Sequence, residues 1–115
     1  MTKNDKTIDD VRRFVEKAAS HYGWELTTEE DHLQNLCRGL LTNYQRYGFY
    51  SCPCRDSWGD REKDKDIACP CTYSHADIRE YGQCFCGLFL SRDFAASGAG
   101  PASIPERRPV AKFPY

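Results

Sequence analysis

The chain has 115 residues, a formal net charge of -1 and 40% apolar residues, which suits a single small domain. The near-neutral charge provides no broad basic field for nucleic acid. No apolar run approaches the roughly 18 residues that span a bilayer. We therefore expect no nucleic-acid partner and no membrane. Met1–Lys6 is polar and no apolar run follows it, which excludes a secretion signal and predicts a cytoplasmic location.

A first amphipathic helix is predicted over residues 7–22. Thr7 and Asp10 form a capping-box pattern at its start, and Gly23 stands where a terminating glycine belongs. Between these signals, apolar residues recur at helical spacing. We interpret the apolar stripe as a core-facing surface with no further role.

A second helix is predicted to begin after Thr27, which with Glu30 repeats the capping pattern, and to end at Gly48. Its apolar stripe includes Cys37. Because unpaired cysteines commonly serve as small buried side chains, we interpret Cys37 as a core residue. His32, near the edge of the stripe, is interpreted as a surface or helix-end residue.

The second half of the chain has weaker signals. Residues 59–66 alternate in charge, which is typical of a solvated loop, and Ser74 precedes a short helix predicted over residues 75–81. No strand is predicted. Residues 95–115 are rich in Pro, Gly and Ala, so we expect an extended tail without regular structure. The predicted fold is mainly α, a small irregular helical domain over residues 1–94.

Six of the seven cysteines form three C-x-C pairs. They are Cys52-Pro53-Cys54, Cys69-Pro70-Cys71 and Cys84-Phe85-Cys86. Structural disulfides are rare in the cytosol, so paired thiols there indicate metal ligands or redox thiols. A disulfide scaffold would also leave one cysteine over.

Zinc and an iron–sulfur cluster are the two metal alternatives. Structural zinc sites favour C-x₂₋₄-C spacing, whereas these pairs have one intervening residue. In an extended chain the two sulfurs of a pair point to the same side, which suits two different iron atoms. A [4Fe–4S] cluster takes four thiolates and leaves two for a redox dithiol, but the spacing does not say which four bind iron.

The three pairs resemble a known family, the catalytic (beta) subunit of ferredoxin:thioredoxin reductase. That family has C-P-C-R, C-P-C and C-H-C, followed by an apolar run ending in L-F-L. Here the chain has Cys52-Pro53-Cys54-Arg55, Cys69-Pro70-Cys71, and Cys84-Phe85-Cys86 before Gly87-Leu88-Phe89-Leu90. The end of the second predicted helix, around Leu40–Gly48, also resembles the family helix before the first pair.

The resemblance implies a role for each cysteine. Matched by position, the [4Fe-4S] ligands are Cys52, Cys69, Cys71 and Cys84. Cys54 and Cys86 match the active-site disulfide, with Cys54 as the exposed nucleophile and Cys86 as the thiol next to the cluster. The implied enzyme is a ferredoxin-dependent disulfide reductase. Its implied partners are a ferredoxin or similar one-electron donor and a thioredoxin-like protein disulfide.

The chain departs from the family pattern at Phe85, where the family has a histidine proposed as a proton donor. The segment between the second and third pairs is also longer. His75, in that segment, is a candidate replacement, although we favour a surface position for it. The sequence leaves open a second subunit, a homodimer or a chain acting alone.

Two other classes of function remain as alternatives. One is a non-catalytic zinc or iron–sulfur module that serves as a protein-binding domain. The other is an electron carrier that holds a cluster but performs no dithiol chemistry.

Overall fold

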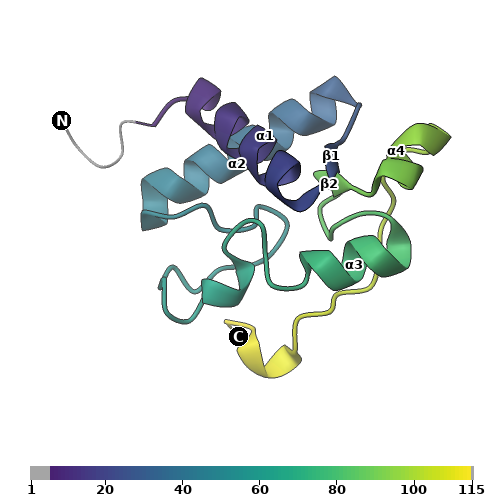
Figure 1. The fold of residues 1–115 in the computed structure, drawn as a ribbon. Coiled ribbons are helices and arrows are strands. Elements are labelled where there is room, and N and C mark those ends of the chain that lie inside the picture. The colour runs from purple at the N-terminus through teal and green to yellow at the C-terminus, as the bar shows by residue number, and fades with distance from the viewer. Residues whose placement is uncertain (1–5, 115) are drawn as a thin grey trace.

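Two crossing helices form one side of the molecule, and three cysteine-bearing loops form the other (Figure 1). This computed structural model describes residues 6–114. The helices are α1 (Ile8–Tyr22), α2 (Glu30–Tyr47), α3 (Ser74–Tyr81) and α4 (Arg92–Ser97). Two short 3₁₀ turns, η1 (Lys65–Ile67) and η2 (Val110–Lys112), lie in the loops and the tail. The predicted mainly α class is confirmed.

The first helix begins and ends as its sequence predicts. The Thr7 hydroxyl accepts from the Asp10 N–H at 3.2 Å, and the Asp10 carboxylate accepts from the Thr7 N–H at 2.9 Å. Gly23 closes α1 with φ 76°, a left-handed conformation that glycine adopts without a Cβ penalty. Both ends are therefore set by local sequence signals.

The second helix keeps its predicted end at Gly48 but not its predicted cap. The N-cap residue of α2 is Glu29, which makes no side-chain capping bond. The Thr27 hydroxyl instead accepts from the Glu29 N–H at 3.3 Å, which forms a turn before the helix. The capping box predicted for Thr27 and Glu30 is therefore wrong, although the helix itself forms.

The core lies between α1, α2 and the loop that follows the third thiol pair. Its buried members include Val11, Val15, Leu36, Cys37, Leu40, Leu88 and Phe89. Cys37 is fully buried, and burial raises the pKa of its thiol. Its interpretation as a core residue is confirmed.

Two short strands, which the sequence does not predict, connect the helical side to the third thiol pair. Strand β1 (Glu25–Leu26) pairs antiparallel with β2 (Phe89–Leu90), in the register Glu25 with Leu90 and Leu26 with Phe89. The pairing places the segment after Cys86 against the turn between α1 and α2. It therefore anchors the third thiol pair to the helical core.

The tail is more ordered than its composition predicts. Helix α4 continues through Ser97, and η2 forms close to the end of the chain. The expectation that nothing regular forms after residue 94 is therefore wrong for these two segments. From α4 the chain passes alongside α3 and ends beside the cysteine-bearing loops (Figure 1).

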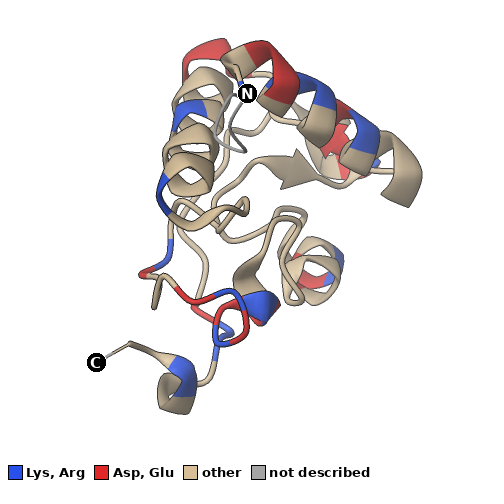
Figure 2. Ribbon diagram, turned by 90° about the vertical axis from the view of Figure 1, so that its left-hand side faces the viewer, with Lys and Arg blue, Asp and Glu red and all other residues tan. Residues whose placement is uncertain are grey.

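Charges of both signs are interspersed along the helices and the loop before the second thiol pair (Figure 2). No helix among the described residues combines the length and the apolar character that crossing a membrane requires.

Candidate functional site

The first thiol pair is placed by the end of α2 and by a short antiparallel contact with the second pair. The Cys52 N–H donates to the Ile67 carbonyl at 2.9 Å, and the Cys69 N–H donates to the Tyr50 carbonyl at 2.7 Å. These two bonds bring together the segments that carry Cys52 and Cys69. A contact at this point between segments 17 positions apart has no local sequence signal.

Gly39 of α2 allows the first pair to approach the helix closely. A Cβ at this position would lie 2.6 Å from the Cβ of Pro53, closer than two carbons can pack. Pro53 therefore packs directly against the backbone of α2 at Gly39, which has no side chain. Cys52 and Cys54 flank Pro53 in the sequence. The sequence marks Gly39 only as a weak residue inside a helical pattern.

The second pair leads directly into α3. The Ser74 N–H donates to the Cys71 carbonyl at 3.0 Å, and the Ser74 hydroxyl lies 3.2 Å from the Cys71 sulfur. The predicted cap at Ser74 is wrong, because the N-cap is Tyr73 without a side-chain capping bond and Ser74 is the first residue of α3. The Ser74 hydroxyl instead contacts the Cys71 sulfur.

A tight turn after the third pair surrounds its first sulfur with backbone donors. The Gly87 N–H donates to the Cys84 carbonyl at 2.9 Å, and the Phe89 N–H approaches the Cys84 sulfur at 3.4 Å. Bonding to the Cys86 side chain, together with backbone donors, outweighs burial and lowers the pKa of Cys84 to about 7. This environment favours a thiolate at Cys84.

One buried cavity collects sulfurs from all three pairs. Its cysteines are Cys52, Cys69, Cys71, Cys84 and Cys86. They include all four residues predicted to bind iron, whereas Cys54 is absent from the lining. Phe85 and Phe89 complete much of its apolar wall.

The donor set of this cavity fits an iron–sulfur cluster. Four thiols surround a shared space, and a cluster takes one thiolate at each of its irons. A single tetrahedral zinc instead needs its ligands to converge within about 2.3 Å of one point. Among residues 6–114, no three His, Cys, Asp or Glu side chains form such a single-ion group.

The two cysteines outside the predicted ligand set contact each other at the edge of the cavity. Cys54 is exposed and Cys86 is half-buried. A hydrogen bond from Cys86 lowers the pKa of Cys54, and bonds to Cys52, Cys54 and Cys84 raise the pKa of Cys86 well above its ordinary value. The Cys52 and Cys86 sulfurs lie 4.0 Å apart. The accessible thiol is therefore the more acidic of the pair, and the inner thiol is its proton donor.

Arg55 places a positive charge among these sulfurs. Its side chain is 2% exposed, and its Nη1 lies 3.2 Å from the Cys71 sulfur and 3.8 Å from the Cys52 sulfur. The guanidinium also lies 4.4 Å from the centroid of the Phe85 ring. Phe85 therefore provides an aromatic face for this cation.

Glu106, from the tail, holds Arg55 in this position. The Arg55 Nε donates to Glu106 Oε2 at 2.8 Å, and its Nη2 donates to Oε1 at 2.7 Å. Burial raises the pKa of Glu106, but hydrogen bonding to Arg55 outweighs it, so the pKa lies below its ordinary value. Sequence reasoning missed Glu106, because nothing local relates it to Arg55, which lies 51 residues earlier.

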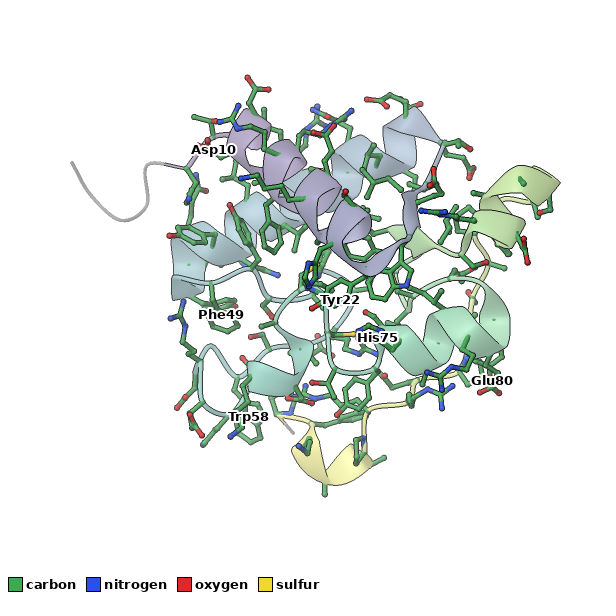
Figure 3. The ribbon with its side chains drawn as sticks, viewed as in Figure 1. Asp10, Tyr22, Phe49, Trp58, His75 and Glu80 are labelled. Carbon is green, nitrogen blue, oxygen red and sulfur yellow. The ribbon has the colours of Figure 1, made fainter. Side chains whose placement is uncertain are left out.

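The two histidines near the site occupy different environments. His75 is exposed and packs against Trp24 and Tyr22, with ring centroids 4.8 and 4.9 Å away, and this packing lies beside the end of α1 (Figure 3). Its surface position is confirmed. His32 is half-buried, and its Nε2 lies 2.8 Å from the Cys86 carbonyl oxygen. The sequence indicates its place near the helix end but not this contact.

Fold and site together define a small helical protein in which the exposed Cys54 lies next to a cavity lined by the other five paired cysteines. The family model for "Ferredoxin thioredoxin reductase catalytic beta chain" matches residues 1–108. The chain belongs to this family, and the resemblance identified from the three thiol pairs is confirmed.

Individual relatives agree with the family match. The chain is 30% identical over 95 residues to the ferredoxin-thioredoxin reductase catalytic chain of Synechocystis sp., covering 80% of this chain and 76% of the relative. It is 28% identical over 93 residues to the chloroplastic catalytic chain of Arabidopsis thaliana, covering 78% of this chain and 60% of that relative. For the Guillardia theta catalytic chain the identity is 28% over 94 residues, with 77% and 85% covered. The matched region is therefore less than two thirds of the Arabidopsis protein.

Proposed function

We propose that the chain is a ferredoxin-dependent disulfide reductase that acts through Cys54 and Cys86 beside a [4Fe–4S] cluster held by Cys52, Cys69, Cys71 and Cys84. The proposal depends chiefly on one observation: the Cys86 sulfur lies 4.0 Å from the sulfur of Cys52, a predicted ligand, and Cys86 also lines the cavity. The exposed Cys54 interacts with Cys86, which lowers the pKa of Cys54. A continuous series of sulfurs thus leads from the surface to the predicted cluster site.

The bound cluster would supply single electrons taken from a ferredoxin-like donor protein. The chain's own residues then perform the thiol chemistry. The Cys54 thiolate attacks one sulfur of a substrate disulfide, forms a mixed disulfide and expels the other substrate sulfur, which takes a proton. Cys86 next attacks the Cys54 sulfur, which releases the second substrate thiol and forms the Cys54–Cys86 disulfide. Two electrons and two protons return that disulfide to two thiols.

The environments of the two thiols suit these roles. Cys54 is exposed, and its lowered pKa increases the fraction of nucleophilic thiolate. The raised pKa of Cys86 favours its protonated form. Arg55 adds positive charge beside Cys54, which also lowers the pKa of that thiol.

The proposed substrate is thioredoxin or a similar protein disulfide, because the names of the relatives include both ferredoxin and thioredoxin. The energetics support this direction. A plant-type ferredoxin near roughly -400 mV and a thioredoxin near about -270 mV differ by about 130 mV. For two electrons this difference is roughly 6 kcal/mol downhill.

Metal analysis combined with thiol labelling tests the proposal. We expect a brown protein with about four irons per chain, in which reduction makes Cys54 and then, more slowly, Cys86 reactive to alkylation. A colourless zinc protein would instead identify a non-catalytic metal module. An iron–sulfur protein whose electron transfer is unaffected by Cys54→Ser would identify an electron carrier. Sizing of the purified chain tests whether it needs a second subunit or forms a homodimer.

A further inference from the structure

The C-terminal segment, defined here as residues 105–114, folds back against the first thiol pair and is held there by three consecutive charged residues. Glu106 binds Arg55, as described above. Arg107 donates to Asp77 Oδ1 at 2.7 Å, and Arg108 donates from Nε to Asp66 Oδ2 at 2.9 Å. Arg108 is 4% exposed, so this residue is buried. The segment is therefore a fixed part of the structure around Cys54.

Beyond these anchors, the segment forms one side of a cavity at Cys54. The cavity has a volume of about 240 Å³. One side is lined by Cys54 and the two residues that follow it, Arg55 and Asp56. The C-terminal segment contributes Glu106, Phe113 and Pro114. The nucleophile proposed above and the end of the chain thus share one space.

Trp58 fixes the far part of the segment. Its indole N–H donates to the Lys112 carbonyl at 2.9 Å, although the Trp58 residue remains 41% exposed. Figure 3 shows Trp58 on the loop next to the C-terminal turn. This bond holds η2 in place, and Phe113 and Pro114 follow directly after it.

The cavity offers apolar contact more than free charge. Glu106 is paired with Arg55, and Arg108, which also lines the cavity, is paired with Asp66. Phe113 and Pro114 are half-buried and provide apolar surface opposite Cys54. A charged group entering here would find these arginine and glutamate charges already neutralised, so an apolar, uncharged segment fits better.

We propose that Phe113 and Pro114, which directly follow η2, form a substrate-selecting wall that contacts the apolar chain next to the exposed disulfide of a protein substrate. The inference rests on the proposed function. In the mixed disulfide the two sulfurs are about 2.05 Å apart, so residues beside the substrate cysteine must enter the space at Cys54. The wall then meets them through Phe113 and Pro114. The family match ends at residue 108, so the wall lies outside the matched region.

Two variants alter the wall and keep the ion pairs of Glu106, Arg107 and Arg108. One ends the chain after Pro109 and so retains Glu106, Arg107 and Arg108. The other is Phe113→Ala in the full-length chain, which removes only the aromatic contact. The matched control is Lys112→Gln, because the Lys112 side chain is exposed and does not line the cavity.

The first measurement uses no substrate. Cluster-loaded, reduced protein is alkylated with iodoacetamide and, separately, with a bulky maleimide, and labelling of Cys54 is followed by mass spectrometry. We expect the shortened chain to react several-fold faster with the bulky reagent and about equally with iodoacetamide. Equal bulky-reagent rates in the shortened and full-length chains would show that residues 110–114 do not border the thiol, which overturns the proposal.

The second measurement compares two disulfides, with reduced methyl viologen as the electron source. The substrates are oxidised thioredoxin and the small aromatic disulfide 5,5′-dithiobis(2-nitrobenzoate). For Phe113→Ala we expect the KM for thioredoxin to rise about five- to tenfold, as for loss of an interface aromatic, with kcat unchanged. The rate with the small disulfide should stay unchanged, and Lys112→Gln should match wild type with both substrates.

The outcomes separate this inference from the function on which it rests. If the wild-type protein reduces neither disulfide, the proposed function is wrong, and the wall cannot select substrates for it. A wild-type protein that reduces both, with an unchanged thioredoxin KM in the two variants, contradicts only the wall. A thioredoxin KM that falls in the shortened chain would identify the segment as an obstructing cover and would also overturn the proposal.

Discussion

Arg55 and Glu106 form a two-point ion pair, with donor–acceptor distances of 2.7 and 2.8 Å, between the first thiol pair and the C-terminal segment. The Arg55 side chain is 2% exposed and the Glu106 side chain 26% exposed. The same guanidinium contacts the sulfurs of Cys52 and Cys71. The pair therefore connects the predicted cluster ligands to the end of the chain.

Replacing Glu106 should destabilise the protein, because the buried guanidinium of Arg55 then loses its negatively charged partner. For Glu106→Gln we expect a loss of about 2 kcal/mol, the scale of a hydrogen bond to a charged group. The unfolding temperature of the cluster-loaded protein should fall by roughly 8 °C, measured by circular dichroism.

The control for this prediction is Glu62→Gln. Glu62 pairs with Lys65 on the surface, where the side chains are 82% and 71% exposed. Such pairs contribute roughly 0.2–1 kcal/mol, so the change in unfolding temperature should be small. Equal losses of unfolding free energy in the two variants would show that burial of Arg55 does not make its ion pair more stabilising than an exposed pair.

Gly39→Ala sets helix propensity against packing. Alanine is favoured over glycine inside a helix by about 1 kcal/mol. However, its Cβ would lie 2.6 Å from Pro53, and overpacking of this kind costs about 1–3 kcal/mol. We expect the first thiol pair to be displaced, so that iron per chain and visible absorbance both fall.

In contrast, Asn35→Ala, at an exposed position of the same helix, should leave the iron content unchanged. Full iron loading in Gly39→Ala would mean that Pro53 can move without disturbing the ligands.

Serine substitutions should divide the cysteines into three groups. Cys69→Ser removes a predicted ligand and should lower the iron content well below four per chain. Cys54→Ser should retain the iron but lose reduction of oxidised thioredoxin by on the order of 1000-fold or more, because it removes the attacking sulfur. Cys37→Ser, in the helical core, should retain both iron and activity. Iron loss in Cys54→Ser would contradict the assignment of that residue as a free thiol.

The anchor at Asp66 predicts a loss of stability in acid. Burial raises the pKa of Asp66, but hydrogen bonds from Tyr73 and Arg108 outweigh it and hold the pKa below its ordinary value. The stabilisation is therefore present above the unfolded pKa of about 3.9 and disappears as the pH falls through the folded pKa.

The test follows unfolding temperatures at about pH 7 and about pH 3, below the unfolded pKa of the carboxyl group. Asp66→Asn should unfold at a lower temperature than wild type near neutrality, and the difference should narrow in acid. Asp93→Asn, at an exposed position of α4, should show no such convergence. A difference between wild type and Asp66→Asn that is independent of pH would show that the carboxylate charge does not hold Arg108.

The elements predicted correctly are those whose signals are local. Helix α1 has its cap at Thr7 and its termination at Gly23 within its own sequence. Helix α3 ends at the predicted Gly82, although its N-cap is Tyr73 and not the predicted Ser74. Periodicity together with such end signals fixes a helix without reference to the rest of the chain.

The elements that were missed depend on distant partners. Strands β1 and β2 have two residues each, too few for an alternating pattern, and they form only because Leu26 meets Phe89. The tail composition predicts no structure, yet Glu106 and Arg108 find charged partners far away in sequence. No pattern in a single sequence specifies such pairings.

For the site, the three thiol pairs indicate the chemistry, and the structure adds their surroundings. The family resemblance predicted which cysteines have which role, and those roles remain predictions. The contacts of Arg55, Ser74 and His32 with the cysteines could not be read from spacing, because they depend on how the loops fold around the cavity.

The core of α1 and α2 extends to the paired cysteines. Val11, Val15, Leu36 and Leu40 belong to one cluster with Cys84, and Cys69 and Cys86 pack against it. Protein interiors are close-packed, so a change of volume at one core residue is transmitted to its neighbours. A cavity-forming substitution in either helix should therefore also disturb the packing around these thiols.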